Sequence, residues 1–443
     1  MNVLIITIDT LRYDYIGYAN NYKNSLTPNI DEFSKEGLIY HHVFSSGTST
    51  PFAFPGILSS IYSSQTKTPG IFSSYLTFSE YLRNKGYFTI GFNGGNIYVS
   101  NIYGYDRGMD YLEKHYVLNT KFKKNSFLRN LVKRSLKFLG LKEFIIKMLE
   151  TKNTFKKVLW NNPLIYRAQD QITDFVKILK ENRKRKFFAF INFMEVHGPY
   201  LGLWKTNFKE RIFMEKLLRK KMYSNDEKMC DYLKFFYTRG IKMVDQQISI
   251  LLNFLDTEGI LDNTIVILTS DHGEEFLEHG NYDHLPKPYD ELIRVPFIVF
   301  MKNKKFSKEE KYAESTRLIS LVDIAPTISM FLFGEKPKEF VGKNSFLGGK
   351  EIRHYIFSEG FRNLNNIRHD ATKKGVHNWC IRTKNLKYME LDRKKYLFDL
   401  LNDPNEQKPK LINKKEELKP EIKELLTEHS KELLHFKLKK HRI

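Results

Sequence analysis

An Asp-His pair, Asp271-His272, follows an apolar run in the second half of the chain and is the clearest candidate for chemistry. A carboxylate oxygen and a neutral imidazole nitrogen suit a divalent cation such as zinc or manganese, whereas calcium and magnesium prefer an all-oxygen shell. The alternative is an ordinary helix start, in which Ser270 or Asp271 caps a helix that begins with Glu274 and Glu275. These residues alone give the two interpretations equal weight.

Two apolar segments would have to position the ligands of such a site. Residues 263–268 (NTIVIL) and 1–8 (MNVLIITI) lack the alternation of a half-exposed strand, so both are predicted to be strands buried on both faces of a parallel sheet. Ligand sites lie beyond the carboxyl ends of such strands, and Asp9 follows the N-terminal one. Because one Asp rarely binds a cation alone, two buried strands that both end in acids favour a shared metal site.

Seven motifs in order along the chain resemble the sulfatase branch of the alkaline phosphatase superfamily. They are residues 6–14 (ITIDTLRYD), 26–31 (LTPNID), 196–200 (VHGPY), 269–280 (TSDHGEEFLEHG), 289–296 (YDELIRVP), 321–327 (LVDIAPT) and 396–404 (YLFDLLNDP). Each motif is weak by itself, and their shared order makes the resemblance specific. It implies an α/β fold like that of alkaline phosphatase: a doubly wound, mostly parallel central sheet with a smaller C-terminal antiparallel sheet subdomain.

The same resemblance implies a division of the chain. We expect residues 1–335 to form the catalytic α/β domain, with a basic helical insertion at about residues 121–186, and residues 336–443 to form the small C-terminal subdomain and a basic helical tail. Residues 334–338 (GEKPK), which are polar and punctuated by Gly and Pro, mark the joint.

The chain departs from the sulfatase pattern at the nucleophile. Sulfatases of the usual kind carry a Cys-x-Pro-x-Arg run whose first residue, Cys or Ser, is converted to formylglycine. The corresponding stretch here, aligned by its downstream half, is residues 50–60 (TPFAFPGILSS), which places Thr50 at the modified position and Phe54 at the Arg. Neither Cys230 nor Cys380 is followed by Pro and Arg at that spacing, so no formylglycine is expected.

An unmodified Thr at this position is what phosphotransferase members of the superfamily use. There a metal-activated hydroxyl attacks phosphorus, and the phospho-threonine intermediate is passed to water or to an acceptor; a bound cation lowers the pKa of the hydroxyl and neutralises transition-state charge. Alignment by Pro51 alone would select Ser49 instead of Thr50, Thr48 is also within reach, and three hydroxyls in an ordinary polar turn are the remaining alternative.

Thr50 is the preferred nucleophile, and we expect one divalent cation, whether zinc, manganese, calcium or magnesium. The implied ligands are Asp9, Thr50, Asp271 and His272. Thr10 stands where the family has the second of two N-terminal aspartates, so fewer carboxylates are expected around the cation than in calcium-dependent sulfatases.

The resemblance also gives roles to three histidines. His197, in a His-Gly-Pro-Tyr turn after residues 187–194 (FFAFINFM), matches a family histidine that contacts the transferred anion or protonates the leaving group. We expect His284 to be catalytic and His279 to bind substrate, with a second metal as the alternative for both.

Two cationic residues are expected to bind the anionic substrate, Lys287 and Arg107. Lys287 lies nearer to Tyr289 than the family's lysine usually does. For Arg107, as for Arg12, a plain salt bridge is the alternative.

The formal net charge of the chain is +21, and most of the excess lies in residues 121–186, which contain 19 Lys and Arg against 5 Asp and Glu. Within this segment, residues 127–139 (FLRNLVKRSLKFL) place apolar side chains at helical intervals between basic ones, which fits a helix on an anionic membrane surface. The commoner alternative is a helix whose apolar face covers the core. Residues 408–443 allow the same two interpretations through Leu425, Leu426, Leu433, Leu434 and Phe436.

A cytoplasmic location is expected, with peripheral contact at the inner face of the membrane as an extension of it. No apolar run reaches the ~20 residues of a membrane span, and Met1 leads into a predicted core strand without a charged leader or cleavage site. Two cysteines are too few for a disulfide framework and fit a reducing compartment.

The sequence therefore predicts a metal-dependent hydrolase of sulfate or phosphate esters that acts through a Thr nucleophile on an anionic substrate, either a glycan or a lipid-linked one. The first alternative is a phosphotransferase that moves a phospho-group to a glycan or lipid acceptor. The alternative of another class is an inactive basic homologue that binds membrane or nucleic acid. Net charge permits it, but no zinc finger, helix-turn-helix or RNP-type motif stands out, and no nucleic-acid partner is expected.

Overall fold

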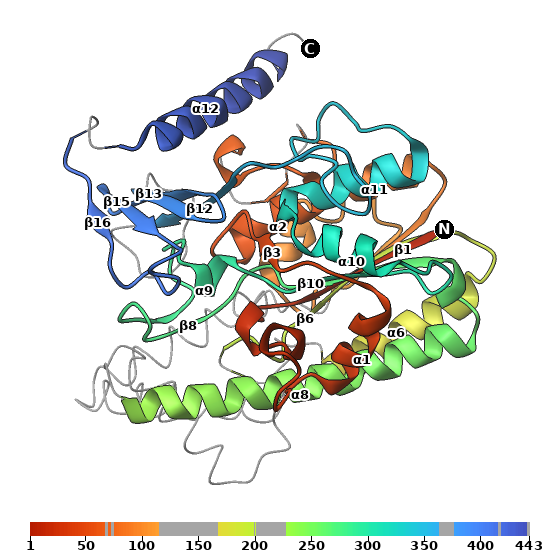
Figure 1. Ribbon diagram of the computed structural model, residues 1–443. Coiled ribbons are helices and arrows are strands. Elements are labelled where there is room, and N and C mark those ends of the chain that lie inside the picture. The colour runs from red at the N-terminus through yellow and green to blue at the C-terminus, as the bar shows by residue number, and fades with distance from the viewer. Residues whose placement is uncertain are drawn as a thin grey trace, which may run out of the picture.

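Seven strands form the central sheet of the computed structural model, in the order β2-β10-β7-β1-β6-β4-β5 (Figure 1). The structure describes residues 1–66, 70–71, 75–114, 167–198, 200, 227–362, 376–414 and 418–440. The strands are β1 (Asn2–Ile8), β2 (Leu38–Ile39), β4 (Phe88–Phe92), β5 (Tyr111–Leu112), β6 (Phe187–Phe193), β7 (Thr264–Thr269) and β10 (Phe297–Phe300).

The central strand β1 pairs in parallel with β6 on one side and β7 on the other, so that Val3 lies between Phe188 and Ile265. Strand β4 continues the parallel pairing beyond β6, whereas β10 runs antiparallel to β7 and β2. The carboxyl ends of β1, β4, β6 and β7 therefore meet at one edge of the sheet. The expected mostly parallel central sheet is confirmed.

Helices cover both faces of this sheet because the strands are apolar on both faces. From β1, Leu4 and Ile6 pack toward α1 (Pro28–Glu36), α6 (Ala168–Glu181) and α8 (Glu227–Thr257). Val3 and Ile5 pack on the opposite side toward α2 (Thr50–Ser59), α3 (Phe78–Asn84) and α11 (Ile324–Phe333). Figure 1 shows α1, α6 and α8 below the sheet, and α2, α11 and α10 (Lys308–Ser315) above it. This is the doubly wound arrangement that the motifs imply.

A second sheet of five antiparallel strands follows near the C-terminus, as expected. Its strands are β12 (Ile356–Arg362), β13 (Val376–Arg382), β14 (Leu386–Leu391), β15 (Lys394–Asp399) and β16 (Lys410–Leu411). One face packs under α12 (Pro420–Lys440) through Ile422 and Leu425. The other face packs on Phe44 and Leu292, which precede the small sheet in the chain. The division at 335/336 stays a prediction; beyond it, Phe340 and Phe346 still pack in the core of the first domain.

Two short strand pairs and one short helix complete the frame of the site. Strands β3 (His42–Phe44) and β11 (Leu318–Ser320) pair in parallel, and β8 (Glu275–Phe276) and β9 (Tyr282–Asp283) form a small antiparallel pair. The short helix α9 (Asp290–Ile293) precedes β10. Since β8 begins at Glu275, no helix starts after Asp271-His272, and the helix-cap interpretation of this pair is wrong.

The basic segments are described only in part. Helix α6, which belongs to residues 121–186, buries Ile172, Phe175 and Leu179 in the core, so this part of the segment covers the sheet. Residues 127–139 lie outside the described residues, as do the side chains of Leu433, Leu434 and Phe436. In the C-terminal run, Leu425 and Leu426 pack on the small sheet.

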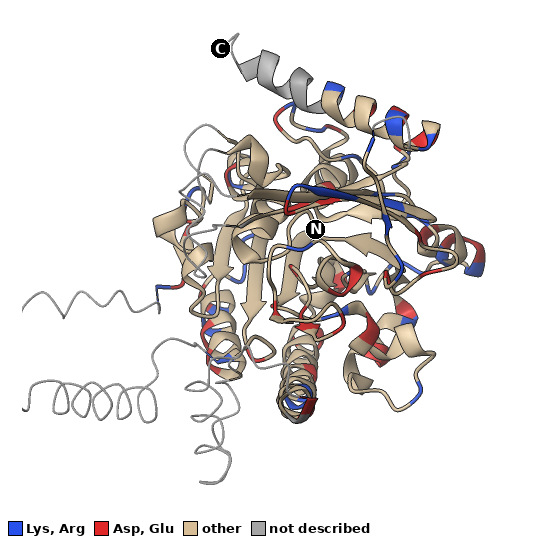
Figure 2. Cartoon of the chain, turned by 90° about the vertical axis from the view of Figure 1, so that its left-hand side faces the viewer, with Lys and Arg blue, Asp and Glu red and all other residues tan. Residues whose placement is uncertain are grey.

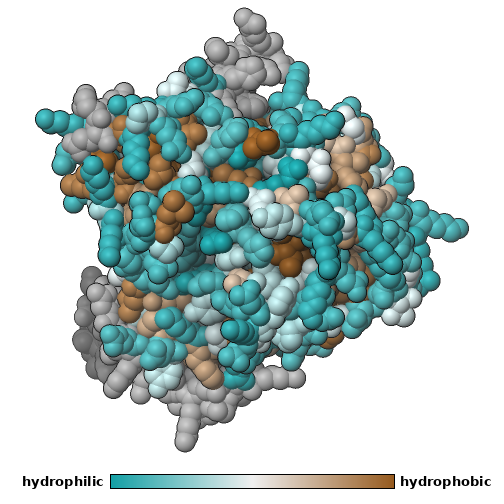
Figure 3. Space-filling model, viewed as in Figure 1, coloured by the Kyte–Doolittle hydropathy of each residue, from teal (hydrophilic) through white to brown (hydrophobic). Residues whose placement is uncertain are grey.

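The described surface carries both acidic and basic residues (Figure 2), and the face drawn in Figure 3 shows no large apolar patch. Acidic residues lie among the Lys and Arg of the described helices in Figure 2. The face in Figure 3 is mainly hydrophilic, with apolar residues in separate groups. Within the described part of the chain, no helix is long and apolar enough to cross a membrane.

Candidate metal centre

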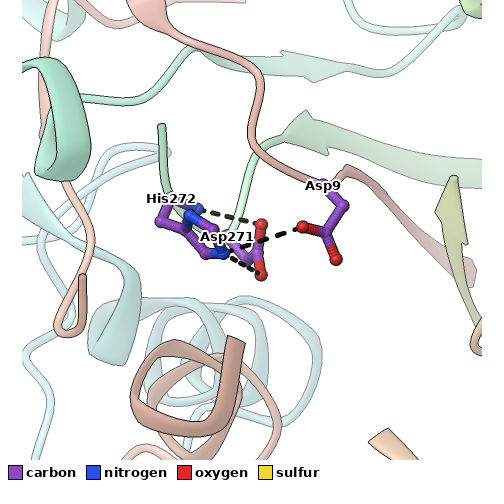
Figure 4. A group of neighbouring side chains, drawn as sticks. All are labelled: Asp9, Asp271 and His272. Atoms are coloured by element: carbon purple, nitrogen blue, oxygen red, sulfur yellow. Dashed lines mark hydrogen bonds and ion pairs between the residues drawn. The ribbon is translucent and has the colours of Figure 1, made fainter. Parts of the chain in front are cut away.

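Asp9 and Asp271 meet beyond the carboxyl ends of the adjacent strands β1 and β7, and His272 lies with them (Figure 4). All three side chains are completely buried. Nε2 of His272 is 3.6 Å from Oδ1 of Asp9 and 3.4 Å from Oδ2 of Asp271. We call Asp9, Asp271 and His272 the metal centre.

The atoms that face one another in the metal centre are all electron-pair donors. Oδ1 of Asp9 and Oδ2 of Asp271 have no hydrogen-bond partner among the described residues. Nδ1 of His272 lies 2.9 Å from the carbonyl oxygen of Gly273, so Nδ1–H is the donor there and Nε2 keeps its lone pair. Such a buried set is costly unless a cation neutralises it, and two carboxylates with one neutral imidazole fit a divalent metal ion.

The pKa values of Asp271 and His272 are shifted because both side chains are buried next to other titratable groups. Burial, together with the negative charge of Asp9, raises the pKa of Asp271 well above its usual range. Burial, with the nearby His284, lowers the pKa of His272 well below its usual range. The imidazole is therefore neutral at physiological pH, which is the state that binds a metal.

The outer oxygens of both carboxylates are fixed by neutral donors. Oδ1 of Asp271 accepts from the backbone N–H groups of Thr10 (3.3 Å) and His272 (2.9 Å). Oδ2 of Asp9 accepts from the side-chain amides of Asn96 (3.1 Å) and Asn192 (3.2 Å). These bonds direct the free oxygen of each carboxylate into the metal centre.

Sequence reasoning missed Asn96 and Asn192. Asn192 lies near the end of the apolar run of β6, and Asn96 lies four residues after β4. A polar residue at the carboxyl end of a predicted parallel strand is the signal that could have identified Asn192. For Asn96, which follows a loop, the sequence carries no comparable signal.

Thr50 is the hydroxyl that the fold brings to the metal centre. It is the first residue of α2, and its Oγ1 lies 3.4 Å from both Oδ2 of Asp9 and Nε2 of His272. The hydroxyls of Thr48 and Ser49 are buried without a hydrogen-bond partner among the described residues. A helix N-terminus favours negative charge, so position 50 suits an ionised hydroxyl.

Two further histidines lie beside the metal centre. The ring of His284 is 4.6 Å from that of His272 and 5.1 Å from that of His197, centroid to centroid. Burial alone would lower the pKa of His284, but Asp283, with Nδ1 to Oδ1 at 2.7 Å, and Glu274 at 3.6 Å outweigh it and raise the pKa well above the usual range. His284 is therefore an imidazolium at neutral pH.

Sequence reasoning also missed Glu274 and Asp283, the two carboxylates that flank His284. Glu274 enters the sequence analysis only in the alternative interpretation, as the start of a helix. These two residues and His284 lie close enough together to bind a metal ion, the alternative considered for His284. Their pairing with an imidazolium accounts for the cluster without one.

Three residues that are expected to bind substrate form hydrogen bonds and ion pairs with residues outside the metal centre. His279 pairs with Glu291 at 2.6 Å and stacks on Tyr289 with ring centroids 3.6 Å apart. Lys287 lies 3.7 Å from Glu275 and donates to the carbonyl oxygen of His279.

The third of these residues is Arg107, which makes two 2.8 Å hydrogen bonds to Glu80 of α3. Arg12 likewise forms salt bridges, to Asp14 and Glu278, as its alternative predicted. The structure brings none of these residues into the metal centre, and their roles in substrate binding stay predictions.

Sequence comparison places the chain among known enzymes. A family model described as Sulfatase matches residues 1–334. An arylsulfatase of Clostridium perfringens is 24% identical, with 90% of each chain aligned. Shorter stretches match an ulvan-active sulfatase of Formosa agariphila, 32% identical over 34% of this chain, and an N-acetylglucosamine-6-O-sulfatase of Bacteroides thetaiotaomicron, 37% identical over 24% of this chain. The aligned stretches span only 22% and 18% of those two enzymes.

Solved structures share the fold along nearly the whole chain. A phosphonate monoester hydrolase of Agrobacterium radiobacter superposes with a TM-score of 0.64 at 16% identity, covering 99% of this chain and 96% of that one. An enzyme bound to its substrate D-glucosamine-2-N,6-O-disulfate superposes with a TM-score of 0.62 at 18% identity and covers 98% of both chains. At these identities the likeness concerns the fold.

Proposed function

The chain belongs to the sulfatase family, and on that premise we propose that it is a metal-dependent hydrolase of sulfate or phosphate esters. One observation carries the proposal: two unpartnered carboxylate oxygens and a neutral imidazole nitrogen converge beside the hydroxyl of Thr50. Asp9, Asp271, His272 and Thr50 would bind the cation. When bound, it would lower the pKa of the hydroxyl and offset charge on the transferred group.

Thr50 is the nucleophile in this proposal. Its oxygen forms a bond to sulfur or phosphorus while the bond to the ester oxygen breaks, and water later releases the group from Thr50. Asn96 donates to both Oδ2 of Asp9 and Oγ1 of Thr50, at 3.1 and 3.4 Å, and so orients the hydroxyl before attack. No formylglycine is needed.

His284 is the proposed general acid. Asp283 and Glu274 raise its pKa well above the usual range, so that it can donate a proton, and its ring lies 4.6 Å from that of His272, beside the metal centre. His197, next to it, would contact the transferred anion. Glu274 and Asp283 keep His284 charged and oriented.

An anionic glycan is the proposed substrate. Support comes from the relatives, which include an N-acetylglucosamine-6-O-sulfatase, and from the positive net charge of +21. The unmodified Thr50 favours phosphorus over sulfur, and for the same reason transfer of a phospho-group to a glycan or lipid acceptor is the second candidate. Cytoplasmic residence and contact with anionic membrane, through residues 127–139, belong to the same hypothesis.

Turnover and adduct formation test the proposal together. The wild-type chain is incubated with aryl sulfates, phosphate monoesters and phosphodiesters under each candidate metal, and both product and intact mass are measured. We expect metal-dependent turnover that Thr50→Ala abolishes and Thr50→Ser, which keeps a hydroxyl, retains in part. Sulfuryl and phosphoryl adducts have nearly equal masses, so the substrate that produces an adduct identifies it.

Variants at the neighbouring hydroxyls are the matched controls. Thr48→Ala and Ser49→Ala should keep turnover. If one of them loses activity and Thr50→Ala does not, the residue replaced in that variant is the nucleophile. No turnover and no adduct with any metal would favour the inactive homologue. A fluorescent-oligonucleotide titration with a steep salt dependence would then identify a nucleic-acid binder, and flotation with anionic vesicles a membrane binder.

A further inference from the structure

Thr10, between Asp9 and the loop after β1, has a backbone conformation that its side chain disfavours. Its φ is +63°, in the left-handed region, where a β-branched residue is a genuine outlier. In this conformation its N–H donates to Oδ1 of Asp271 at 3.3 Å. Among the described residues, its own hydroxyl bonds only to the adjacent carbonyl oxygen of Asp9, at 2.7 Å. The threonine side chain therefore does not explain why the strained conformation persists.

Tyr237 of α8 contacts the backbone at Thr10 and two residues after it. Its hydroxyl donates to the carbonyl oxygen of Thr10 at 2.7 Å and accepts from the N–H of Arg12 at 2.8 Å. The phenol is completely buried, and burial raises its pKa well above the usual range, so it stays neutral and can both donate and accept.

The ring of Tyr237 is fixed independently of its hydroxyl. It packs edge to face against Tyr15 and Phe276, with ring centroids 4.9 Å away in each case, and against Tyr200 at 6.4 Å. These ring contacts do not involve the hydroxyl, and two of them, to Phe276 and Tyr200, lie outside the loop after β1. Removing only the hydroxyl leaves this packing intact.

We propose that Tyr237 is a positioning residue of the metal centre: its hydroxyl fixes Thr10 in the left-handed conformation that points the Thr10 N–H at Asp271. Through that bond it directs the free Oδ2 of Asp271 toward Asp9 and His272. The inference rests on the proposed function, because it concerns the geometry of the same metal centre. It adds a role for a residue of α8, which contributes no ligand.

Manganese binding to the full chain tests the inference. With Mn²⁺ alone as the probe, followed by electron paramagnetic resonance of the free ion, Tyr237→Phe should bind about 10- to 100-fold more weakly than wild type. Adding Thr10→Gly to Tyr237→Phe should restore affinity to within about threefold of wild type, since glycine adopts positive φ without strain. A purely structural role for the phenol would not be rescued in this way.

Tyr40→Phe is the matched control. Tyr40 is also completely buried, and its hydroxyl donates to Glu314 at 2.7 Å and accepts from the N–H of Leu347 at 3.1 Å. It should lose a similar amount of thermal stability and keep wild-type affinity for Mn²⁺.

Two outcomes overturn the role of Tyr237 alone: wild-type affinity in Tyr237→Phe, or a double variant that binds as weakly as Tyr237→Phe. If the single variant does not fold, the double variant is compared with wild type directly, and weak binding again overturns the inference. Failure of the wild type itself to bind Mn²⁺ would overturn the metal centre and the inference with it.

Discussion

At the scale of single residues, the two carboxylates of the metal centre are oriented without being neutralised. Their hydrogen bonds within the described chain come from side-chain amides, backbone N–H groups and the hydroxyl of Thr50, and no Lys or Arg donates to them. Neutral donors fix a carboxylate but leave its negative charge available. A divalent cation bound between them would complete the charge balance of the site.

Asn96 gives the first prediction at this scale. Asn96→Ala removes the donor shared by Asp9 and Thr50, and we expect turnover to fall by about 10- to 100-fold. The free energy of unfolding should fall by only about 1 kcal/mol. Steady-state kinetics and thermal unfolding measure the two effects.

Asn182→Ala is the control for Asn96→Ala. The amide of Asn182 donates to the carbonyl oxygen of Ile178 at the end of α6, at 2.9 Å, away from the metal centre. Its kinetics should match wild type. Equal kinetics in Asn96→Ala would show that the amide does not orient Thr50.

The sequence predicted the side chains that meet in the metal centre better than the residues that orient them. Asp9, Asp271 and His272 follow strongly apolar strands, so strand ends alone brought them together. Asn96 and Glu274 lie in loops and Asp283 lies in the two-residue strand β9, and side-chain periodicity does not encode such short or irregular segments. His279 lies within a family motif and Lys287 lies between two of them, yet His279 pairs with Glu291 and Lys287 with Glu275.

At the scale of elements, α12 is attached to the small sheet through a buried histidine. His429 stacks on Phe357 of β12 with ring centroids 4.0 Å apart, and its Nδ1 lies 3.4 Å from the hydroxyl of Tyr355. Burial, with the positive charges of Arg353 and His377, lowers the pKa of His429 to about 4. The helix is thus docked by a neutral imidazole in an apolar, electropositive setting.

The docking of α12 should weaken in acid. The unfolded state binds a proton at His429 below pH 6.5, whereas the folded state does so only near pH 4, so unfolding becomes easier as the pH falls between these values. The shift corresponds to about 3 kcal/mol of unfolding free energy. Denaturant unfolding at a series of pH values measures it.

His429→Leu is expected to remove this part of the pH dependence, since leucine cannot titrate. The exposed His354→Leu is the control and should retain the wild-type pH dependence. Parallel pH profiles for wild type and His429→Leu would contradict the assignment.

At the scale of the whole molecule, the small sheet is bonded directly to the loop that carries Thr50. The N–H of Thr48 donates to the carbonyl oxygen of Glu359 in β12 at 3.2 Å, and the N–H of Glu359 donates to Ser46 at 3.0 Å. The C-terminal sheet therefore forms part of the wall that positions the nucleophile. No sequence pattern predicts this contact, because it depends on how the small sheet packs against the part of the chain that carries the central sheet.

Gly360 of β12 is where this contact is tightest. A Cβ there would lie 2.5 Å from Oγ1 of Thr48 and 2.7 Å from Cβ of Pro286, so Gly360→Ala has to displace the loop before Thr50. We expect a loss of about 1–3 kcal/mol in unfolding free energy and reduced turnover. Adding Thr48→Ala removes the nearer obstacle and should recover part of both. Wild-type kinetics in Gly360→Ala would show that the contact with the small sheet does not affect catalysis.

The parallel pairing of β1 also has a consequence for synthesis of the chain. Val3 pairs with Phe188 and Ile265, which are translated 185 and 262 residues later. At about 5–20 residues per second, the second partner follows after about 10–50 s. While the first 185 of these residues are made, a strand whose residues 3–8 are all destined for burial has neither neighbour, and it lacks the second until β7 is made. Biosynthesis of this protein is therefore expected to depend on chaperones that shield the nascent N-terminal strand until β7 has emerged.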